Sequence, residues 1–222
     1  MLYVAEGNFS RVARPPSSGL FVSKMLKDLS KKPTSPSTEE VKKYLKQWED
    51  EEEYRDSEKS LSKLFLNSSN NSLDEIIVKV CALDVVFSAQ VGRWFFDVSK
   101  HIKNYDFDTK FKDKEFDVNK FAIIEVKDIK NDKTKNRNFY SFATKYCSHH
   151  NSEDYPIYDF YVDEVLQYFM GEKLNLKKTS LKKYPIFVDT LKVFREEYHL
   201  EVFKLREIDK YIWLLGKEFF TR

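Results

Sequence analysis

The spacing of apolar residues constrains the fold of this chain more than any other feature. Behind Ser72, the apolar residues Ile76, Val80, Leu83 and Phe87 follow one another at intervals of three or four positions. This spacing places them on one face of an α-helix, which must pack against other elements to be stable. Similar series recur before and after this stretch. The sequence therefore predicts an all-α fold, a bundle of amphipathic helices.

Helix boundaries are marked by short polar signals. Ser37 with Glu40, and Ser72 with Glu75, have the spacing of a capping box, in which each side chain caps the other residue's backbone N–H. Gly171 is a natural helix stop. Together with the apolar spacing, these signals predict helices at residues 38–49, near 61–65, at 72–87, 91–103, 139–147 and 159–170, and in two stretches near 187–194 and 208–219.

Two regions are harder to interpret. Residues 121–126 are apolar without a clear period and are compatible with a strand or a helix, and we favour a helix. Residues 127–137 are rich in charge and predict a loop. Gly92 lies at the start of a predicted helix, and we expect it to let a neighbouring helix or backbone approach closely.

The sequence predicts one packed domain with an N-terminal arm. Residues 1–37 contain two stretches rich in Pro, Ser and Lys that flank a short apolar and basic segment at 20–29, so we expect an arm with one short helix. A chain of 222 residues, 41% of them hydrophobic, can bury a core without disulfides or metals. We therefore assign residues 38–222 to one helical domain of one or two lobes.

Cysteine content, apolar runs and charge limit the cell compartment and the partners. Cys81 and Cys147 lie on apolar helix faces, which predicts packing in a reducing compartment. No apolar run is long enough to span a membrane and no signal pattern opens the chain, so we expect a cytoplasmic monomer. The net charge is only +2, and nucleic-acid binding would depend on local basic clusters at 127–137 and 173–183.

The most informative motif is a lysine followed by an aspartate. Lys145 lies near the middle of a predicted helix, and after a turn the sequence Pro156-Ile157-Tyr158-Asp159 begins the next helix. This arrangement resembles the catalytic core of the helix-hairpin-helix DNA glycosylase superfamily, especially its branch with the 8-oxoguanine DNA glycosylase (OGG) fold. The family has a glycine-containing hairpin before the lysine, whereas residues 135–139 of this chain contain no glycine.

The resemblance implies a helical glycosylase fold and a specific chemistry. Lys145 would be the nucleophile that attacks C1′ of the deoxyribose, and Asp159 the carboxylate that stabilises positive charge on the sugar. The partner would be double-stranded DNA with a flipped nucleotide, and neither a cofactor nor a metal is required. The excised base would be an oxidised purine or a modified base in phage DNA, which corresponds to DNA repair or phage defence. Whether an AP-lyase step follows stays open.

The resemblance also indicates which side chains would bind DNA. Aromatic and imidazole rings near the motif would hold the flipped base, and basic residues before it would hold phosphates. We predict these binding roles for Phe142, Tyr146, His149, Tyr158, Arg137 and Lys135.

Other interpretations remain open. A lysine on an amphipathic helix is most often solvated, and an aspartate at a helix start is most often only an N-cap. The chain could therefore be a non-catalytic helical protein-binding module, which has no need for Lys145 and Asp159 to converge. A metal-dependent nuclease is a third reading, but it lacks ligands at motif spacing. Its only dense acidic candidates are Asp154, Asp159, Asp163 and Glu164.

Overall fold

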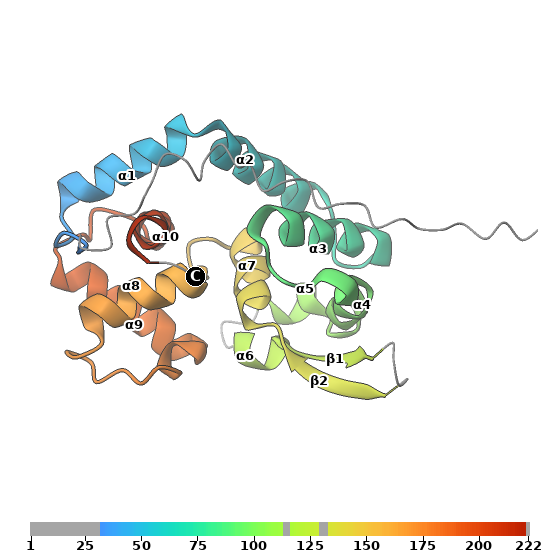
Figure 1. The fold of residues 1–222 in the computed structure, drawn as a ribbon. Helices are drawn as coiled ribbons and strands as arrows, with labels where there is room; N and C mark the ends of the chain where they lie inside the picture. Colours follow the sequence, from blue (N-terminus) through green and yellow to red (C-terminus); the bar gives the residue numbers. More distant parts are fainter. Residues whose placement is uncertain (1–31, 113–115, 129–132, 221–222) are drawn as a thin grey trace, which may run out of the picture.

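The computed structural model describes residues 32–112, 116–128 and 133–220, and these are predominantly helical, as predicted (Figure 1). The helix predicted at residues 20–29 lies outside the described residues. In the described ranges, no helix is both long enough and apolar enough to cross a membrane.

The elements form two lobes (Figure 1). We call the first the C-terminal lobe, because α1 packs there against α10, and α8 against both α9 and α10. It consists of α1 (Thr38–Asp50), α8 (Phe160–Met170), the short helix η2 (Ser180–Lys182), α9 (Tyr184–Glu197) and α10 (Leu205–Phe219). The rest is the central lobe. It consists of α2 (Glu52–Asn67), α3 (Leu73–Phe87), η1 (Gly92–Trp94), α4 (Phe95–Asn104), α5 (Phe107–Lys110), α6 (Val118–Phe121), β1 (Ile123–Lys127), β2 (Thr134–Asn138) and α7 (Tyr140–His150).

The two lobes share one hydrophobic core. Buried residues of both lobes, from Val41 in α1 to Leu215 in α10, form a single contiguous cluster. At Gly216 the backbone of α10 approaches α8 so closely that a Cβ atom there would lie 2.6 Å from the Cβ of Tyr161. A larger residue would push the two helices apart.

The predicted helix at residues 121–126 is wrong. Only α6, which ends at Phe121, is helical there, and β1 follows it. β1 pairs antiparallel with β2, with Ile123 opposite Asn138 and Lys127 opposite Thr134. The side chains of β1 alternate between exposed and buried positions, because its inner face packs against α4. The second half of the predicted basic loop is therefore a fully exposed edge strand.

Local signals at the helix ends were partly misleading. The Ser37 hydroxyl caps α1 by accepting a hydrogen bond from the N–H of Glu40. Ser72 does not cap α3: its hydroxyl donates to Asp74. The Glu75 carboxylate accepts instead from the backbone N–H and hydroxyl of Ser69. Gly92 does not serve a close approach either. It has a φ of +50°, and nothing lies within 4 Å of where its Cβ would be, so its role is the left-handed backbone of the turn after α3.

Candidate functional site

A cavity of about 980 Å³ opens between the two lobes, and both residues of the predicted motif line it. Lys145 reaches it from α7 and Asp159 from the start of α8. The C-terminal lobe contributes side chains of α1, α8 and α10, and the central lobe contributes those of α2, β2 and the turn after α3. The structure therefore brings together the lysine and the aspartate that the sequence placed on different helices.

Lys145 is almost completely buried on α7, with 3% of its surface exposed. Its Nζ donates a hydrogen bond of 2.7 Å to the Oγ of Ser141, one helical turn earlier. A buried lysine is rare among lysines in general, since removing an ammonium group from water is costly. The expectation that a lysine on such a helix is merely solvated does not apply here.

Asp159 is the N-cap of α8. Its Oδ1 accepts a hydrogen bond of 3.0 Å from the N–H of Val162. The aspartate therefore has the ordinary capping role that the sequence allowed and, in addition, borders the cavity. Capping holds the carboxylate in one place, which is also what a group that stabilises charge on a substrate requires.

The segment at residues 156–159 is held from three sides. The N–H of Tyr158 donates to the Oγ1 of Thr144 on α7 at 3.2 Å, and the N–H of Ile157 donates to the Oδ2 of Asp209 on α10 at 3.3 Å. The hydroxyl of Tyr184 on α9 donates to the carbonyl of Pro156 at 3.1 Å. Because both lobes grip this extended segment, its position relative to α7 is well defined.

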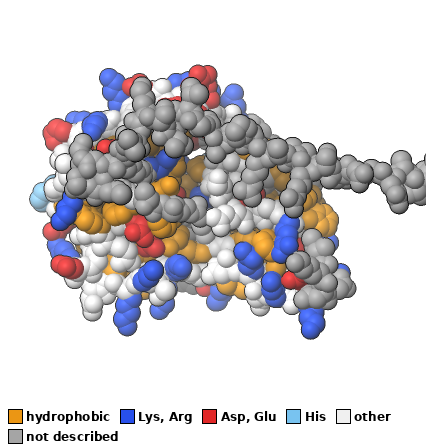
Figure 2. Space-filling view, in the orientation of Figure 1, with side chains coloured by type: hydrophobic (Ala, Val, Ile, Leu, Met, Phe, Trp, Pro, Cys, Tyr) orange, Lys and Arg blue, Asp and Glu red, His pale blue; other side chains and the backbone are white. Residues whose placement is uncertain are grey.

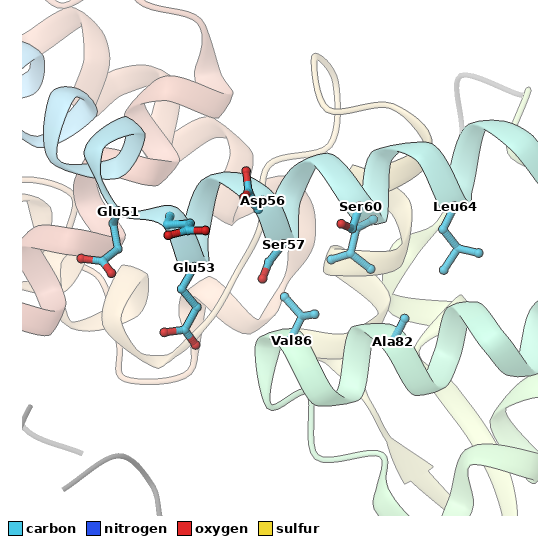
Figure 3. Close-up of a pocket in the computed structure, with 10 residues that line it drawn as sticks. Glu51, Glu53, Asp56, Ser57, Ser60, Leu64, Ala82 and Val86 are labelled. Carbon is cyan, nitrogen blue, oxygen red and sulfur yellow. The ribbon is translucent and has the colours of Figure 1, made fainter. Parts of the chain in front are cut away.

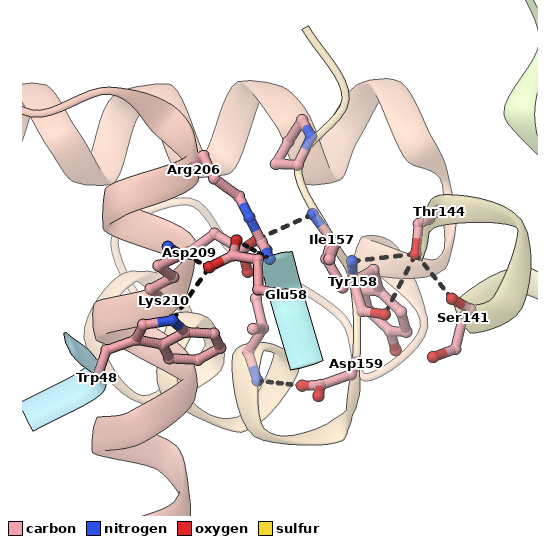
Figure 4. Close-up of polar contacts among 12 residues, drawn as sticks. Trp48, Glu58, Ser141, Thr144, Ile157, Tyr158, Asp159, Arg206, Asp209 and Lys210 are labelled. Atoms are coloured by element: carbon pink, nitrogen blue, oxygen red, sulfur yellow. Dashed lines mark hydrogen bonds and ion pairs between the residues drawn. The ribbon is translucent and has the colours of Figure 1, made fainter. Parts of the chain in front are cut away.

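Asp209 belongs to a buried charge network (Figure 4). Arg206 lies 2.6 Å from Asp209 and 3.1 Å from Glu58, and Lys210 lies 2.6 Å from Glu58. Burial raises the pKa of Asp209 to about 6, although the charge of Arg206 opposes this. Burial also disfavours ionisation of Glu58, but Arg206 and Lys210 outweigh it and lower that pKa. The network joins α2 to α10 behind the 156–159 segment.

Asp163 supplies a second carboxylate at the cavity. The hydroxyl of Tyr158 donates to its Oδ2 at 3.0 Å. Its Oδ1 is buried and has no hydrogen-bond partner among the described residues. Burial raises the pKa of Asp163, in spite of the hydrogen bond from Tyr158. An unsatisfied buried oxygen at a cavity wall is a point where a polar ligand group can bind.

Aromatic rings form one wall of the cavity. Trp48, Tyr54 and Trp213 lie in mutual contact, with ring centres 5.1 to 5.7 Å apart. Tyr161 extends this wall, its ring centre 6.4 Å from that of Trp213. Phe139, Tyr140 and Tyr158 line the cavity on the α7 side. Lysines lie over these rings: the Nζ of Lys217 is 4.5 Å from the ring centre of Trp213 and 5.1 Å from that of Tyr54, and the Nζ of Lys210 is 5.0 Å from that of Trp48.

Some of the predicted DNA-binding residues line the cavity and others do not. Tyr158, Phe142 and Arg137 line the cavity, although Phe142 is only 1% exposed. Tyr146 does not line it: the ring is fully buried, and its hydroxyl donates to Asn70. His149 is also turned to the interior, between Phe65 and Phe87. Tyr146 belongs to the hydrophobic core and His149 packs against two rings, and neither lines the cavity where a base would bind.

The two predicted phosphate contacts lie on the exposed strand β2. The Arg137 guanidinium lies 4.0 Å from the ring centre of Trp94, which holds it in a cation–π contact at the cavity edge. The Nζ of Lys135 is 3.7 Å from Asp128 and lies away from the cavity lining. Of the two, Arg137 is the one adjacent to the site.

Asp209 and Thr144 position the 156–159 segment, and neither was predicted as a site residue. A signal for Asp209 was nonetheless present: it lies three positions before Ile212 and seven before Gly216, on the face that α10 buries. A carboxylate at a core position of an amphipathic helix needs a buried partner. That requirement marks it as part of a network.

A second hollow, of about 680 Å³, lies between α2 and α3 (Figure 3). It is acidic at the end near Glu51 and Glu53 and apolar near Leu64 and Ala82, and it contains none of the predicted site residues. Within the described residues, no three His, Cys, Asp or Glu side chains are grouped so that they could hold a metal ion.

Comparison with known proteins identifies a family for this chain but does not indicate an activity. An uncharacterized protein of Haemophilus influenzae is 48% identical over 90 residues, which cover 40% of this chain and 42% of that protein, less than half its length. No solved structure matches. The model of the family described as "HI_0787_N: N-terminal domain" matches residues 40–154, which include Lys145 and end before Asp159. Since these residues are more than half of the chain, it belongs to the HI_0787_N family.

Proposed function

We propose that this protein is a DNA glycosylase that excises a damaged or modified base from a flipped nucleotide. One observation carries the proposal: Lys145 and Asp159 line the same cavity between the lobes. The resemblance to helix-hairpin-helix glycosylases of the OGG fold assigns these two residues the roles of nucleophile and sugar-stabilising carboxylate. A protein-binding module would have no use for their convergence.

The aromatic wall and the size of the cavity support a nucleotide as the ligand. A flipped base must leave the DNA stack, and stacking between aromatic side chains offsets that loss. Trp48, Tyr54 and Trp213 line the cavity, and a base that stacks on Tyr54 or Trp213 would replace the Lys217 ammonium group that now lies over both rings. A volume of about 980 Å³ accommodates a base together with its sugar.

The proposed reaction uses the two residues in sequence. The lone pair of the Lys145 amine attacks C1′, the N-glycosidic bond breaks, and its electron pair leaves with the base, which takes up the proton that the amine loses. Asp159 stabilises the positive charge that develops on the sugar while this bond breaks. Ring opening then leaves a Schiff base between Nζ and C1′. In a lyase step, elimination from this adduct would release the 3′ phosphate.

Borohydride trapping tests the proposal directly, because it reduces a Schiff base to a stable amine. Wild type, Lys145→Gln and Asp159→Asn are incubated with duplexes that each carry one oxidised or hypermodified base. We expect a covalent protein–DNA adduct with wild type, its complete loss in Lys145→Gln, and a reduction of roughly 100-fold or more in Asp159→Asn, as for other groups that stabilise a developing charge. Lys192→Gln and Asp189→Asn, both on the exposed surface of α9, are the matched controls.

The other possible outcomes of the trapping experiment each lead to a different conclusion about the mechanism. Free base released without an adduct would replace the lysine mechanism by attack of water assisted by Asp159. An adduct that persists in Lys145→Gln would assign the nucleophile to another amine. No base release from any duplex, with all variants folded by circular dichroism, would reject the glycosylase and favour the helical protein-binding module.

A further inference from the structure

The loop between α8 and α9 carries a cluster of exposed lysines. Lys177, Lys178, Lys182 and Lys183 all lie on its surface. None of the four forms an ion pair with a carboxylate of the described residues. Lys182 has one charged neighbour, the carboxylate of Asp163. Exposed positive charges such as these can attract a polyanion, because binding releases the counterions of its phosphates.

This loop is held firmly in place. The Tyr140 hydroxyl of α7 donates to the carbonyl of Leu181 at 3.1 Å, and the Asn119 side chain of α6 donates to the carbonyl of Lys182 at 2.8 Å. Gln167 of α8 donates to the carbonyl of Lys177 at 3.3 Å. Three neighbouring elements therefore fix the backbone that carries the lysines, so little ordering entropy would be lost when a ligand binds.

The loop borders the same cavity as the proposed catalytic pair. Lys178 and Lys182 line this cavity together with Lys145, and Arg137 lines it from β2. Figure 1 shows the loop after α8 and the β hairpin on either side of α6, at the same edge of the molecule. Lysine and arginine side chains follow this edge from one to the other (Figure 2). Basic groups thus flank the cavity on two sides. Its lining also contains the carboxylates of Glu53, Glu58, Asp159, Asp163 and Glu164.

We propose that Lys178 and Lys182 bind the DNA phosphates next to the flipped nucleotide, opposite Arg137. This deepens the proposed function and rests on it. A nucleotide inserted between the lobes leaves its flanking phosphates at the cavity mouth, within reach of both basic groups.

Salt-dependent binding to a short fluorescein-labelled duplex tests this proposal without any chemistry. Fluorescence anisotropy is measured at several salt concentrations for wild type, Lys178→Gln/Lys182→Gln and Lys42→Gln/Lys46→Gln. The last variant removes the same charge from exposed positions of α1. For the loop variant we expect a several-fold lower affinity at low salt and a slope of log K against log salt that is smaller by about two, one unit for each lysine. The α1 variant should behave as wild type.

The outcomes separate the two proposals. Equal salt slopes for the loop variant and the α1 variant would overturn the role of the lysines, whether or not the protein excises a base. Wild type that binds no duplex even at low salt would overturn it as well. Loss of binding in the loop variant, combined with no excision from any duplex by wild type, would support the phosphate contacts and reject the glycosylase.

Discussion

Two adjacent histidines show how burial decides the role of a residue. His149 and His150 lie at the end of α7, and both are packed among aromatic rings, His150 with its ring centre 4.9 Å from that of Phe107. The Nε2 of His149 has no hydrogen-bond partner among the described residues. Burial lowers the pKa of both to about 3, with the nearby Arg206 adding to the effect at His149. Both rings are therefore neutral at physiological pH and pack against aromatic side chains.

The pKa of His149 predicts a loss of stability in mild acid. The folded protein keeps His149 neutral down to about pH 3, whereas the unfolded chain takes up a proton near its ordinary pKa of 6.5. The unfolded state therefore binds more protons in this window, and the free energy of unfolding falls as pH drops from 6.5 toward 3. At pH 5 the loss due to this one group should be about 2 kcal/mol.

Urea unfolding at pH 7 and pH 5 measures this effect. The variant His149→Phe should lose about 2 kcal/mol less than wild type between the two pH values, because it has no proton to bind. His199→Asn is the control, since His199 is exposed and has a φ of +54° that asparagine tolerates. A pH dependence in His149→Phe equal to that of wild type would contradict the buried, neutral state of His149.

At the scale of elements, the extended segment before α8 determines the geometry of the site. It is too short to form a regular element, and its backbone groups are satisfied by side chains of α7, α9 and α10. Buried backbone N–H groups must be paired, so each of these bonds constrains the segment. Thr144 is of particular importance, since it lies one residue before Lys145 and holds the residue before Asp159.

Replacement of Thr144 by valine should therefore affect stability and activity together. Valine has nearly the same shape but cannot accept the hydrogen bond from Tyr158. The buried N–H of Tyr158 then remains unsatisfied, which should lower the free energy of unfolding by about 1 to 3 kcal/mol. If the glycosylase proposal holds, trapping yield should fall while affinity for unmodified duplex is unchanged.

Thr144→Ser is the matched variant, because it keeps the hydroxyl and removes only a methyl group. It should retain most of the trapping activity. Urea unfolding, borohydride trapping and anisotropy on the two variants together check the prediction. Equal loss of trapping in Thr144→Val and Thr144→Ser would show that packing, and not the hydrogen bond to Tyr158, sets the position of the segment.

At the scale of the whole molecule, the site lies between two lobes that share one core. The first described helix, α1, packs on the last one, α10, so the ends of the domain are joined. The ion pairs from Glu58 on α2 to Arg206 and Lys210 on α10 connect the lobes beside the cavity. Such mutual packing ties the stability of one lobe to that of the other.

The shared core predicts that the two lobes unfold as one unit. The chain has three tryptophans, of which Trp48 and Trp213 lie in the C-terminal lobe and Trp94 in the central lobe. In Trp48→Phe/Trp213→Phe, fluorescence comes from Trp94, which contacts Phe139 and Arg137 and so reports on the central lobe, while far-UV circular dichroism reports on all helices. We expect the same urea midpoint from both signals. Two separate midpoints would show that the lobes are independent domains.

Not every element could be predicted from the sequence. The apolar run at residues 121–126 contains Ile123, Ile124 and Val126, which fit a strand, but a helix in that position would bury them equally well. The strand is selected because β2 supplies hydrogen-bond partners and α4 covers Ile124 and Val126. Pairing and cover of this kind come from residues distant in the sequence, and a local pattern does not contain them.

The sequence alone determined the helical class and the order of the main helices, because the period of apolar residues encodes which face each helix must bury. It also singled out Lys145 and Asp159. Only the tertiary structure decided that these two meet at one cavity, that Tyr146 is buried while His149 packs against Phe65 and Phe87, and that Asp209 holds the segment before α8. The reason is physical. Aromatic residues make up 16% of the chain, and their rings both fill the core and line the cavity. Packing between segments that are distant in the sequence decides which rings lie in which place.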